Sequence, residues 1–313
     1  MSSKIEFEYV KCNICDKGNS KHLFMVEDKQ FESTEKFSIV KCRNCGLAYL
    51  NPRPEKNEIG KFYPKEYFSL NAFSDSKLRV KLWKFPKFFG VRSDFYTYSF
   101  IKKRSKGKIL DVECGCGELL KLLKEDKWET YGVDTSITAT EKAKKEGLDV
   151  FTGELNEAGF RDNYFDVVIL HHSLEHIHDP TEVLRKIYRA LKDNGTLIIG
   201  VPNIRSIRSR IFKKNWFAIK APRHLYHFSV HTLDLLLDKT GFIRQKIYFD
   251  PSTKPLITNV VQQISNEFIK IFINHMRFIF FTILHPITLI LPKFHLGDSF
   301  VVIAEKFKSI YKE

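Results

Sequence analysis

Two carboxylates and a pair of glycines form the most informative chemical pattern in the chain. An apolar run ends in Asp111, and Gly115 and Gly117 follow it; a second apolar run ends in Asp134, seventeen residues past Gly117. Glycines let the backbone turn sharply and let a ligand approach the main chain. The helix expected after them offers free N–H groups to an anion, and an acid about 20 residues further on can accept hydrogen bonds from ribose hydroxyls. The pattern therefore predicts a site for a nucleoside-containing cofactor.

The details of this pattern narrow the cofactor class. A dinucleotide-binding turn requires a third glycine in the spacing G-x-G-x-x-G, and Leu120 stands at that position here. A nicotinamide cofactor is therefore disfavoured. The elements that must position the glycines are a buried strand expected over residues 108–113 and a helix expected over 118–123, where apolar residues recur at helical spacing.

These residues resemble the first motif of the class I S-adenosylmethionine-dependent methyltransferases, in which an acid precedes alternating glycines. The resemblance extends over residues 100–306. It implies an α/β, Rossmann-like fold with a seven-stranded sheet, and S-adenosylmethionine as the cofactor. The residues that hold the cofactor by this resemblance are Asp111, Glu113, Gly115, Gly117, Asp134, Glu154 and His171.

Later segments carry the same resemblance. Gly153-Glu154 is similar to the acidic turn after the third strand, near the adenine, and residues 165–172 to the fourth strand. Residues 173–180 resemble the loop that faces the methyl group, and 191–203 resemble the end of a helix, a turn and the fifth strand. Residues 299–304 are similar to the last, antiparallel strand.

One residue departs from the family pattern. Glu113 occupies the position of the first glycine. Since relatives carry Ala or Ser there, the backbone at this position is not expected to require a positive φ. The side chain, however, adds size and negative charge near the carboxylate of the cofactor. Two interpretations follow: a working site with an unusual lining, which we favour because every other motif position is intact, or a weakened site.

Four cysteines near the N-terminus form a second pattern. Cys12 and Cys15 are separated by two residues, as are Cys42 and Cys45, with 26 residues between the pairs. Two such pairs bring four thiolates into one tetrahedron, as in structural zinc sites. Two disulfides are the alternative, which a cytosolic chain disfavours. We therefore predict a structural zinc ribbon.

A four-cysteine ribbon ahead of a methyltransferase domain resembles a bacterial group of sugar and surface-polysaccharide methyltransferases. The resemblance implies an acceptor hydroxyl or carbon on a sugar or on a lipid-linked intermediate. Within that group the ribbon either contacts the acceptor or serves only as a packing lid, and the sequence favours neither role.

Two blocks that contain histidine are candidates for acceptor chemistry. Glu175 and His176 lie in the loop that the resemblance places near the methyl group; His176 is the first choice for a general base, with Glu175 orienting it. His224 and His227 belong to an Arg-His-Leu-x-His-Phe block that covers the active site in the resembling enzymes. The alternatives are structural: His176 as a wall of the pocket, and the other two histidines packed beneath the capped helix expected over 232–238.

Length and charge limit the remaining possibilities. The chain has 313 residues, 43% hydrophobic and 28% charged, which suits about two globular domains. Its net charge is +14, with eleven Lys or Arg over 77–108 and seven, without an acid, over 204–224. The positive electrostatic potential of such stretches attracts anions: nucleotide-linked or pyrophosphate-linked sugars, nucleic acid or anionic membranes. The alternative is that the lysines only form a solvated surface and bind no partner. A non-catalytic nucleic-acid-binding protein with a degenerate cofactor site is therefore one competing function.

An apolar stretch near the C-terminus raises the question of membrane contact. Residues 278–291 contain no Lys, Arg, Asp or Glu, and basic residues precede them within the segment 268–292. Fourteen residues are too few to span a bilayer, which takes about 20, and Pro286 would break a helix there. An interfacial segment on an anionic membrane and a packed hydrophobic hairpin are the two interpretations. A quinone-type lipid O-methyltransferase would explain this stretch and is a second competing function.

The predicted organisation has three parts. A zinc ribbon over residues 1–50 precedes a basic, aromatic connecting region over 51–105 and a class I methyltransferase domain over 106–313, with an apolar insertion at about 255–295. No apolar segment follows Met1, so we expect a cytoplasmic protein, with peripheral contact at the inner membrane face as an option.

Overall fold

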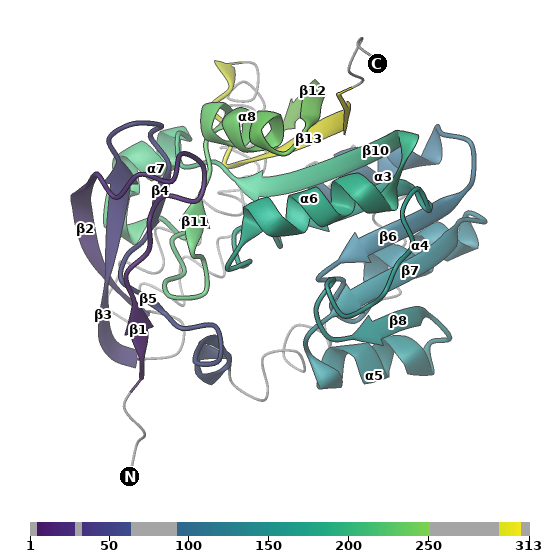
Figure 1. Cartoon of the computed structure of the whole chain (residues 1–313), viewed down its shortest axis with the longest axis horizontal. Helices are drawn as coiled ribbons and strands as arrows, with labels where there is room; N and C mark the ends of the chain where they lie inside the picture. The colour runs from purple at the N-terminus through teal and green to yellow at the C-terminus, as the bar shows by residue number, and fades with distance from the viewer. Residues whose placement is uncertain (1–4, 29–32, 64–92, 251–293, 308–313) are drawn as a thin grey trace, which may run out of the picture.

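A seven-stranded sheet forms the larger part of the molecule (Figure 1). The computed structural model describes residues 5–28, 33–63, 93–250 and 294–307. The strands of this sheet are β6 (Lys108–Val112), β7 (Glu129–Asp134), β8 (Asp149–Thr152), β9 (Phe165–His171), β10 (Leu191–Pro202), β12 (Phe242–Phe249) and β13 (Ser299–Lys306). They lie in the order β12-β13-β10-β9-β6-β7-β8. Only β13 runs antiparallel to its neighbours within this sheet. The predicted Rossmann-like seven-stranded fold is confirmed.

Alternating side chains explain why helices cover both faces of the sheet. On β9, Val167 and Ile169 belong to one apolar cluster, and Val168 and Leu170 belong to another. Parallel strands are normally buried on both faces in this way. Helices α3 (Ser93–Lys102) and α4 (Glu118–Glu125) contribute to the first cluster, and α6 (Pro180–Ala190) and α8 (Val230–Lys239) contribute to the second. The remaining helices are α5 (Ile137–Lys145), α7 (Ile207–Phe212) and the 3-10 turns η1 (Ile59–Phe62) and η2 (Lys213–Asn215).

The N-terminal segment forms a second sheet at one end of the large one (Figure 1). Its antiparallel strands are β2 (Ser20–Asp28), β3 (Ser33–Cys42) and β4 (Ala48–Leu50), and β11 (Tyr226–His227) from the large domain pairs with β4. A short ladder joins β1 (Phe7–Glu8) to β5 (Arg53–Pro54). One continuous apolar cluster contains Leu47 of this segment and Leu170 of the large sheet. The two sheets therefore share a core.

The predicted elements around the site are confirmed in most cases. The helix expected over 118–123 is α4, the strand expected over 165–172 is β9, and the last strand expected over 299–304 is β13. The capped helix is α8, whose first turn holds a capping box: Ser229 Oγ accepts from the Thr232 N–H at 3.2 Å, and Thr232 Oγ1 accepts from the Ser229 N–H at 2.9 Å. The fifth strand, β10, begins at residue 191, directly after α6.

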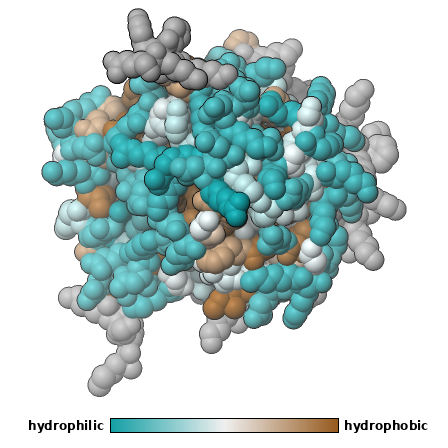
Figure 2. Space-filling model, turned by 45° about the vertical axis from the view of Figure 1, so that its right-hand side comes forward, coloured by the Kyte–Doolittle hydropathy of each residue, from teal (hydrophilic) through white to brown (hydrophobic). Residues whose placement is uncertain are grey.

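Two predicted segments lie outside the described residues: residues 64–92 of the connecting region and the apolar stretch 268–292. Within the described residues, no helix combines the length and the apolar character needed to cross a bilayer. The face drawn in Figure 2 is mostly hydrophilic, with hydrophobic residues in small separate patches. The three domain boundaries stay predictions.

Candidate active site

The glycine turn after β6 borders the predicted cofactor site. Gly115 and Gly117 have φ values of 56° and 75°, in the left-handed region that glycine tolerates best. A Cβ on Gly117 would collide with the side chain of Leu148, whereas a Cβ on Gly115 would meet nothing within 4 Å. The left-handed backbone and the contact with Leu148 both favour glycine at position 117, and the turn at Gly115 leaves room for a ligand to approach the main chain.

Asp134 holds this turn from the end of β7. Its side chain is buried; Oδ2 accepts a hydrogen bond from the Gly115 N–H at 2.7 Å, and Oδ1 accepts one from the Ser136 N–H at 2.8 Å. Burial raises the pKa of Asp134, and these two hydrogen bonds oppose that effect. Each carboxylate oxygen keeps a further lone pair, so Asp134 can also accept from a ribose hydroxyl. Asp111 is buried near the end of β6, the strand next to β7.

The expectation for the backbone at Glu113 is wrong. Its φ is 59°, so a residue other than glycine holds a left-handed conformation at the start of the turn. This conformation costs about 1–2 kcal/mol in a residue that has a Cβ. The residue has a solvent-accessible part, but many protein atoms surround its carboxylate. These surroundings, together with the negative charges of Asp134 and Glu175, raise the pKa of Glu113 well above its usual range. Steric strain and unfavourable charge thus coincide at this position.

Two further predicted cofactor residues have partners within the protein. Glu154, after β8, pairs with Lys56 of the N-terminal segment, with 2.6 Å between Nζ and Oε1. His171 ends β9, and its ring lies edge-on to that of His172, with centroids 4.6 Å apart. A Cβ on Gly200 would lie 2.7 Å from the His171 ring, so glycine at that position makes room for the imidazole. The cofactor roles of Glu154 and His171 stay predictions.

The four predicted acceptor-side residues gather at one place. One ligating atom from each of Glu175, His176 and His224 lies within 4.8 Å of the others. The ring centroids of His176 and His224 are 4.7 Å apart, and those of His224 and His227 are 6.4 Å apart. The Leu225 N–H donates to the Glu175 carbonyl oxygen at 2.8 Å and ties the two loops together. We call Glu175, His176, His224 and His227 the histidine cluster.

Backbone carbonyl groups fix the tautomers of two of these histidines. Nδ1 of His176 lies 2.9 Å from the Arg223 carbonyl oxygen, and Nδ1 of His224 lies 2.9 Å from that of Ala218. A carbonyl oxygen only accepts, so both Nδ1 atoms carry the proton and both Nε2 atoms keep a lone pair. Burial lowers the pKa of His176 and His224, and it lowers that of His227 to about 4. All three imidazoles are therefore neutral at pH 7.

Glu175 is the charged member of the histidine cluster. Its side chain is 1% exposed, and Oε1 lies 3.5 Å from Nδ1 of His172. Burial acts to raise the pKa of Glu175, but the interaction with His172, and the positive charge that His176 and His172 would carry when protonated, leave the pKa below its ordinary value. Glu175 is thus a buried carboxylate that stays ionised. His172, which the sequence analysis did not select, also has a left-handed backbone, with a φ of 56°.

The N-terminal segment supplies residues to this site that sequence reasoning missed. Tyr63 Oη lies 3.2 Å from Nδ1 of His176. Asp28, at the end of β2, accepts two hydrogen bonds from the guanidinium of Arg223, at 2.6 and 2.9 Å, and both side chains are buried. Arg223 is the residue whose carbonyl oxygen orients His176. No sequence signal marks Asp28, because a buried acid and a surface acid look alike in a sequence.

The four predicted zinc ligands converge at one point, at the end of β3 where Cys42 lies. One sulfur from each of Cys12, Cys15, Cys42 and Cys45 lies within 4.8 Å of the others. The closest separations, 3.3 and 3.5 Å, exceed the roughly 2.05 Å of a disulfide. Ligands about 2.3 Å from one zinc ion stand about 3.8 Å apart in a tetrahedron, so the four thiolates fit a structural zinc ion.

The two cysteine pairs share one backbone geometry. The Asp16 N–H donates to the Cys12 carbonyl oxygen at 2.8 Å, and the Gly46 N–H donates to that of Cys42 at 3.1 Å. Asp16 and Gly46 both have positive φ, at 57° and 82°. Each pair thus sits in a tight turn that presents its two sulfurs to the same point.

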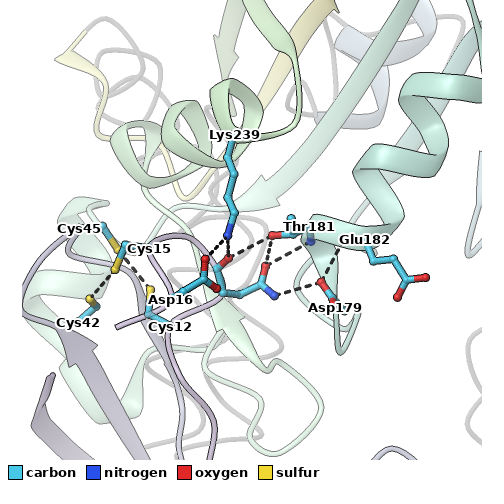
Figure 3. A network of polar contacts seen from close by, with 10 residues as sticks. Cys12, Cys15, Asp16, Cys42, Cys45, Asp179, Thr181, Glu182 and Lys239 are labelled. Carbon is cyan, nitrogen blue, oxygen red and sulfur yellow. Dashed lines mark hydrogen bonds and ion pairs between the residues drawn. The ribbon is translucent and has the colours of Figure 1, made fainter. Parts of the chain in front are cut away.

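The first cysteine turn is also bound to the large domain (Figure 3). The Asn13 side-chain amide donates to Asp179 at 3.1 Å, and its oxygen accepts from the Thr181 N–H at 3.2 Å. Lys239, at the end of α8, donates to Asp16 and to the Asn13 carbonyl oxygen, both at 2.9 Å. Asp179 is the N-cap of α6, whose preceding loop carries Glu175 and His176. The first cysteine turn therefore holds the helix that follows the loop of Glu175 and His176.

Part of the basic stretch 204–224 is internal. The Arg208 side chain is buried and pairs with buried Asp298, and Arg223 pairs with Asp28. Lys220 interacts electrostatically with Glu175. Arg208 and Arg223 are thus paired inside the protein and do not add to a positive outer surface, which weakens the argument from charge for binding nucleic acid.

Comparison with known proteins identifies the family of the large domain. A family described as methyltransferase domain matches residues 89–243, about half of the chain. The chain carries a class I S-adenosylmethionine-dependent methyltransferase domain. Its fold is that of an S-adenosylmethionine-dependent methyltransferase from Archaeoglobus fulgidus, with a TM-score of 0.51 at 20% identity, over 78% of this chain and all of that one.

The methyltransferase domain also has curated relatives with named activities. A ubiquinone/menaquinone biosynthesis C-methyltransferase of Desulfotalea psychrophila is 31% identical over 29% of this chain and 40% of its own length. A ubiquinone biosynthesis O-methyltransferase of Methylococcus capsulatus is 32% identical over 33% of this chain and 46% of its own length. The chain thus matches less than half of either enzyme.

Substitutions at Asp134 and Glu113 test the predicted cofactor-binding residues. Asp134→Ala removes the predicted ribose acceptor and is expected to weaken binding of S-adenosylmethionine by about 1.5–3 kcal/mol, the cost of losing a hydrogen bond to a charged group. Glu113→Gly relieves the left-handed backbone and removes a charge, so it should bind the cofactor as well as the wild type or better. Isothermal titration calorimetry measures both effects. Weaker binding by Glu113→Gly would mean that the Glu113 side chain contributes to the cofactor site.

Proposed function

We propose that the protein transfers the methyl group of S-adenosylmethionine to a hydroxyl oxygen or an acidic carbon of a small acceptor. The observation that carries the proposal is the orientation of His176: its Nδ1–H is committed to the Arg223 carbonyl oxygen, its Nε2 keeps a lone pair, and the ring interacts electrostatically with Glu175. The loop that carries His176 follows β9, which is adjacent to the β6 strand of the cofactor turn. Ligands of open α/β sheets bind at this carboxyl edge of the strands.

Different residues would bind the cofactor and accept the proton of the acceptor. The turn at Gly115 and the carboxylate of Asp134 would bind the cofactor, which supplies an activated methyl group on a sulfonium when bound. His176 Nε2 takes the proton of the acceptor as the new bond to the methyl group forms, and ionised Glu175 stabilises the imidazolium that results. Alignment of acceptor and donor by the surrounding loops supplies much of the remaining acceleration.

The test of this proposal is the response of turnover to His176→Ala. We expect turnover to fall about 10²- to 10⁴-fold, the range of general acid–base catalysis, while calorimetry shows binding of S-adenosylmethionine nearly unchanged. Because burial lowers the pKa of His176 below its ordinary 6.5, the acid limb of the wild-type rate profile should lie below pH 6.5. An unchanged rate with the physiological acceptor would make His176 a wall of the pocket.

The acceptor that we propose is a sugar, nucleotide-linked or lipid-linked, of the kind used to build surface polysaccharides. The proposal rests on the sequence resemblance to ribbon-containing sugar methyltransferases, and the contact between Tyr63 and His176 supports it, because it brings the N-terminal segment to the acceptor side. A quinone acceptor is the second candidate, which the named activities of the relatives favour. Formation of S-adenosylhomocysteine with nucleotide-linked sugars, and not with a demethylated quinone, is the expected result.

We also propose a cytoplasmic protein in peripheral contact with the inner membrane face. The support is the sequence of residues 268–292, which lie outside the described residues. The protein should float with anionic liposomes at low salt, each nearby Lys or Arg adding about 1 kcal/mol, and salt should release it because it screens the attraction. Replacing Phe280, Phe281 and Leu284 by serine should abolish flotation and spare cofactor binding. If the wild type does not float at low salt, the segment has no membrane role.

A further inference from the structure

We infer that Glu175, His176 and His224 form a binding site for a divalent transition-metal ion, separate from the four-cysteine site. One carboxylate oxygen and one nitrogen from each imidazole lie within 4.8 Å of one another. Ligands about 2.1 Å from a single zinc ion stand about 3.4 Å apart in a tetrahedron. Modest rotations of three side chains therefore suffice to close the site around an ion.

The hydrogen bonds behind the two histidines are those of metal ligands. A ligating imidazole normally donates its other N–H to a carbonyl or carboxylate oxygen, which fixes the tautomer and makes the ligating nitrogen more basic. Both His176 and His224 do this from Nδ1, to carbonyl oxygens at 2.9 Å. Each therefore has a neutral Nε2 available, the state that a metal requires.

The carboxylate of Glu175 gives a second, independent indication. Both of its oxygens are buried, and neither has a hydrogen-bond partner among the described residues. A buried carboxylate without hydrogen bonds is expensive, and such groups are usually paired or coordinate metals. Nδ1 of the His172 imidazole lies 3.5 Å from Oε1, which is a pairing distance and longer than an ordinary hydrogen bond. A bound ion would satisfy the two oxygens directly.

Of the charged groups around the site, one favours binding of a cation and one opposes it. Glu113 adds a negative charge near Glu175 when it is ionised, which favours a cation. Lys220 interacts electrostatically with Glu175 and opposes one; dense protein surroundings lower its pKa, although its side chain remains accessible. Two imidazoles and one carboxylate with an open fourth position are the ligand set of catalytic zinc and of non-haem iron(II).

Bound there, the ion would bind the acceptor hydroxyl at the open position and lower its pKa. This consequence rests on the proposed function. In the metal-loaded protein His176 would be a ligand in place of the base, and the proton of the acceptor hydroxyl would pass to solvent water. The site itself does not depend on the reaction, because it is defined by the three side chains and their hydrogen bonds.

The test is a titration of the full-length protein, purified under reducing conditions with zinc in its ribbon, with Co²⁺. We expect one equivalent to bind with weak visible bands and no thiolate charge-transfer absorption. X-ray absorption should show a nitrogen and oxygen shell with imidazole scattering and no sulfur. Glu175→Gln and His224→Gln should bind Co²⁺ at least about 10- to 100-fold more weakly, which is the loss typical even of outer partners. His231→Gln, at an exposed histidine of α8, is the matched control and should bind as the wild type does.

The zinc content of the ribbon and the circular dichroism spectrum show whether each variant is folded. No second equivalent in the wild type, a sulfur shell around the cobalt, or undiminished binding by both folded variants would overturn the site. If a variant fails to fold, the absorption spectrum of the loaded wild type decides. Methyl transfer at full rate in a chelating buffer that leaves the ribbon zinc in place would remove the ion from the mechanism. Cobalt binding without any methyl transfer would count against the proposed function only.

Discussion

Replacing Cys12 and Cys42 by serine is expected to remove one zinc ion per chain and to abolish methyl transfer, while S-adenosylmethionine still binds. Structural zinc contributes about 10–16 kcal/mol to the folding of small zinc modules, more than any other single feature of the N-terminal segment. Elemental analysis compares the zinc content of the variant and the wild type, and calorimetry measures cofactor binding.

The separation of the two effects follows from the contacts of the ribbon. The cysteine turn holds Asp179 and Thr181 through Asn13, and β2 holds Arg223 through Asp28. These contacts lead to the loop of His176, whereas the glycine turn and Asp134 follow or end β6 and β7, which pair with no strand of the N-terminal sheet. Loss of the ribbon should therefore disorder the loops that carry the histidine cluster first, and hydrogen exchange can follow this residue by residue.

Cys116→Ser is the matched control for this prediction. Cys116 is a free cysteine in the glycine turn and does not belong to the four-sulfur cluster. Its variant should keep the full zinc content. A double variant at Cys12 and Cys42 that retains as much zinc as the wild type, or that transfers methyl groups at the wild-type rate, would contradict the role given to the ribbon.

The sequence predicts best those features that depend on local pattern. The apolar run before Asp111, the glycines after it and the helical spacing of 118–123 lie within a few residues of one another, and each appears where it was expected. The two cysteine pairs are equally local, since one short turn orients each pair. Their convergence follows from the number of ligands that zinc requires.

Contacts between distant segments could not be predicted. The pairing of β11 with β4 joins residues almost 180 positions apart, and nothing in Tyr226-His227 distinguishes a two-residue strand from a loop. Tyr63 is one of twelve tyrosines, and its contact with His176 depends on how the two sheets pack. The prediction that Glu113 would not need a positive φ failed for a different reason. The tolerance of small residues in relatives says little about φ at this position.

Breaking the ion pair between Asp28 and Arg223 is expected to cost about 3–5 kcal/mol of folding free energy. Removing one partner of a buried pair leaves the other charge buried and uncompensated. Asp28→Ala should do this to Arg223, whose side chain is about 1% exposed and also donates to the Phe62 carbonyl oxygen at 3.2 Å. Urea denaturation measures the loss. Glu27→Ala is the matched control on the same strand: Glu27 and Lys36 are exposed and 3.9 Å apart, so the change should cost less than about 1 kcal/mol.

The same pair distinguishes a purely structural role from a role in positioning His176. Asp28→Leu combined with Arg223→Met removes both charges and should restore most of the stability, because apolar residues often replace a buried pair at little cost. Activity should not return with it. The Arg223 carbonyl oxygen keeps His176 in one tautomer only while the backbone at position 223 is held in place, and the guanidinium holds it through Asp28. A double variant that is stable, binds S-adenosylmethionine and turns over at the wild-type rate would show that the ion pair only stabilises the fold. A stable variant with reduced turnover and an altered acid limb would show that the ribbon orients the base.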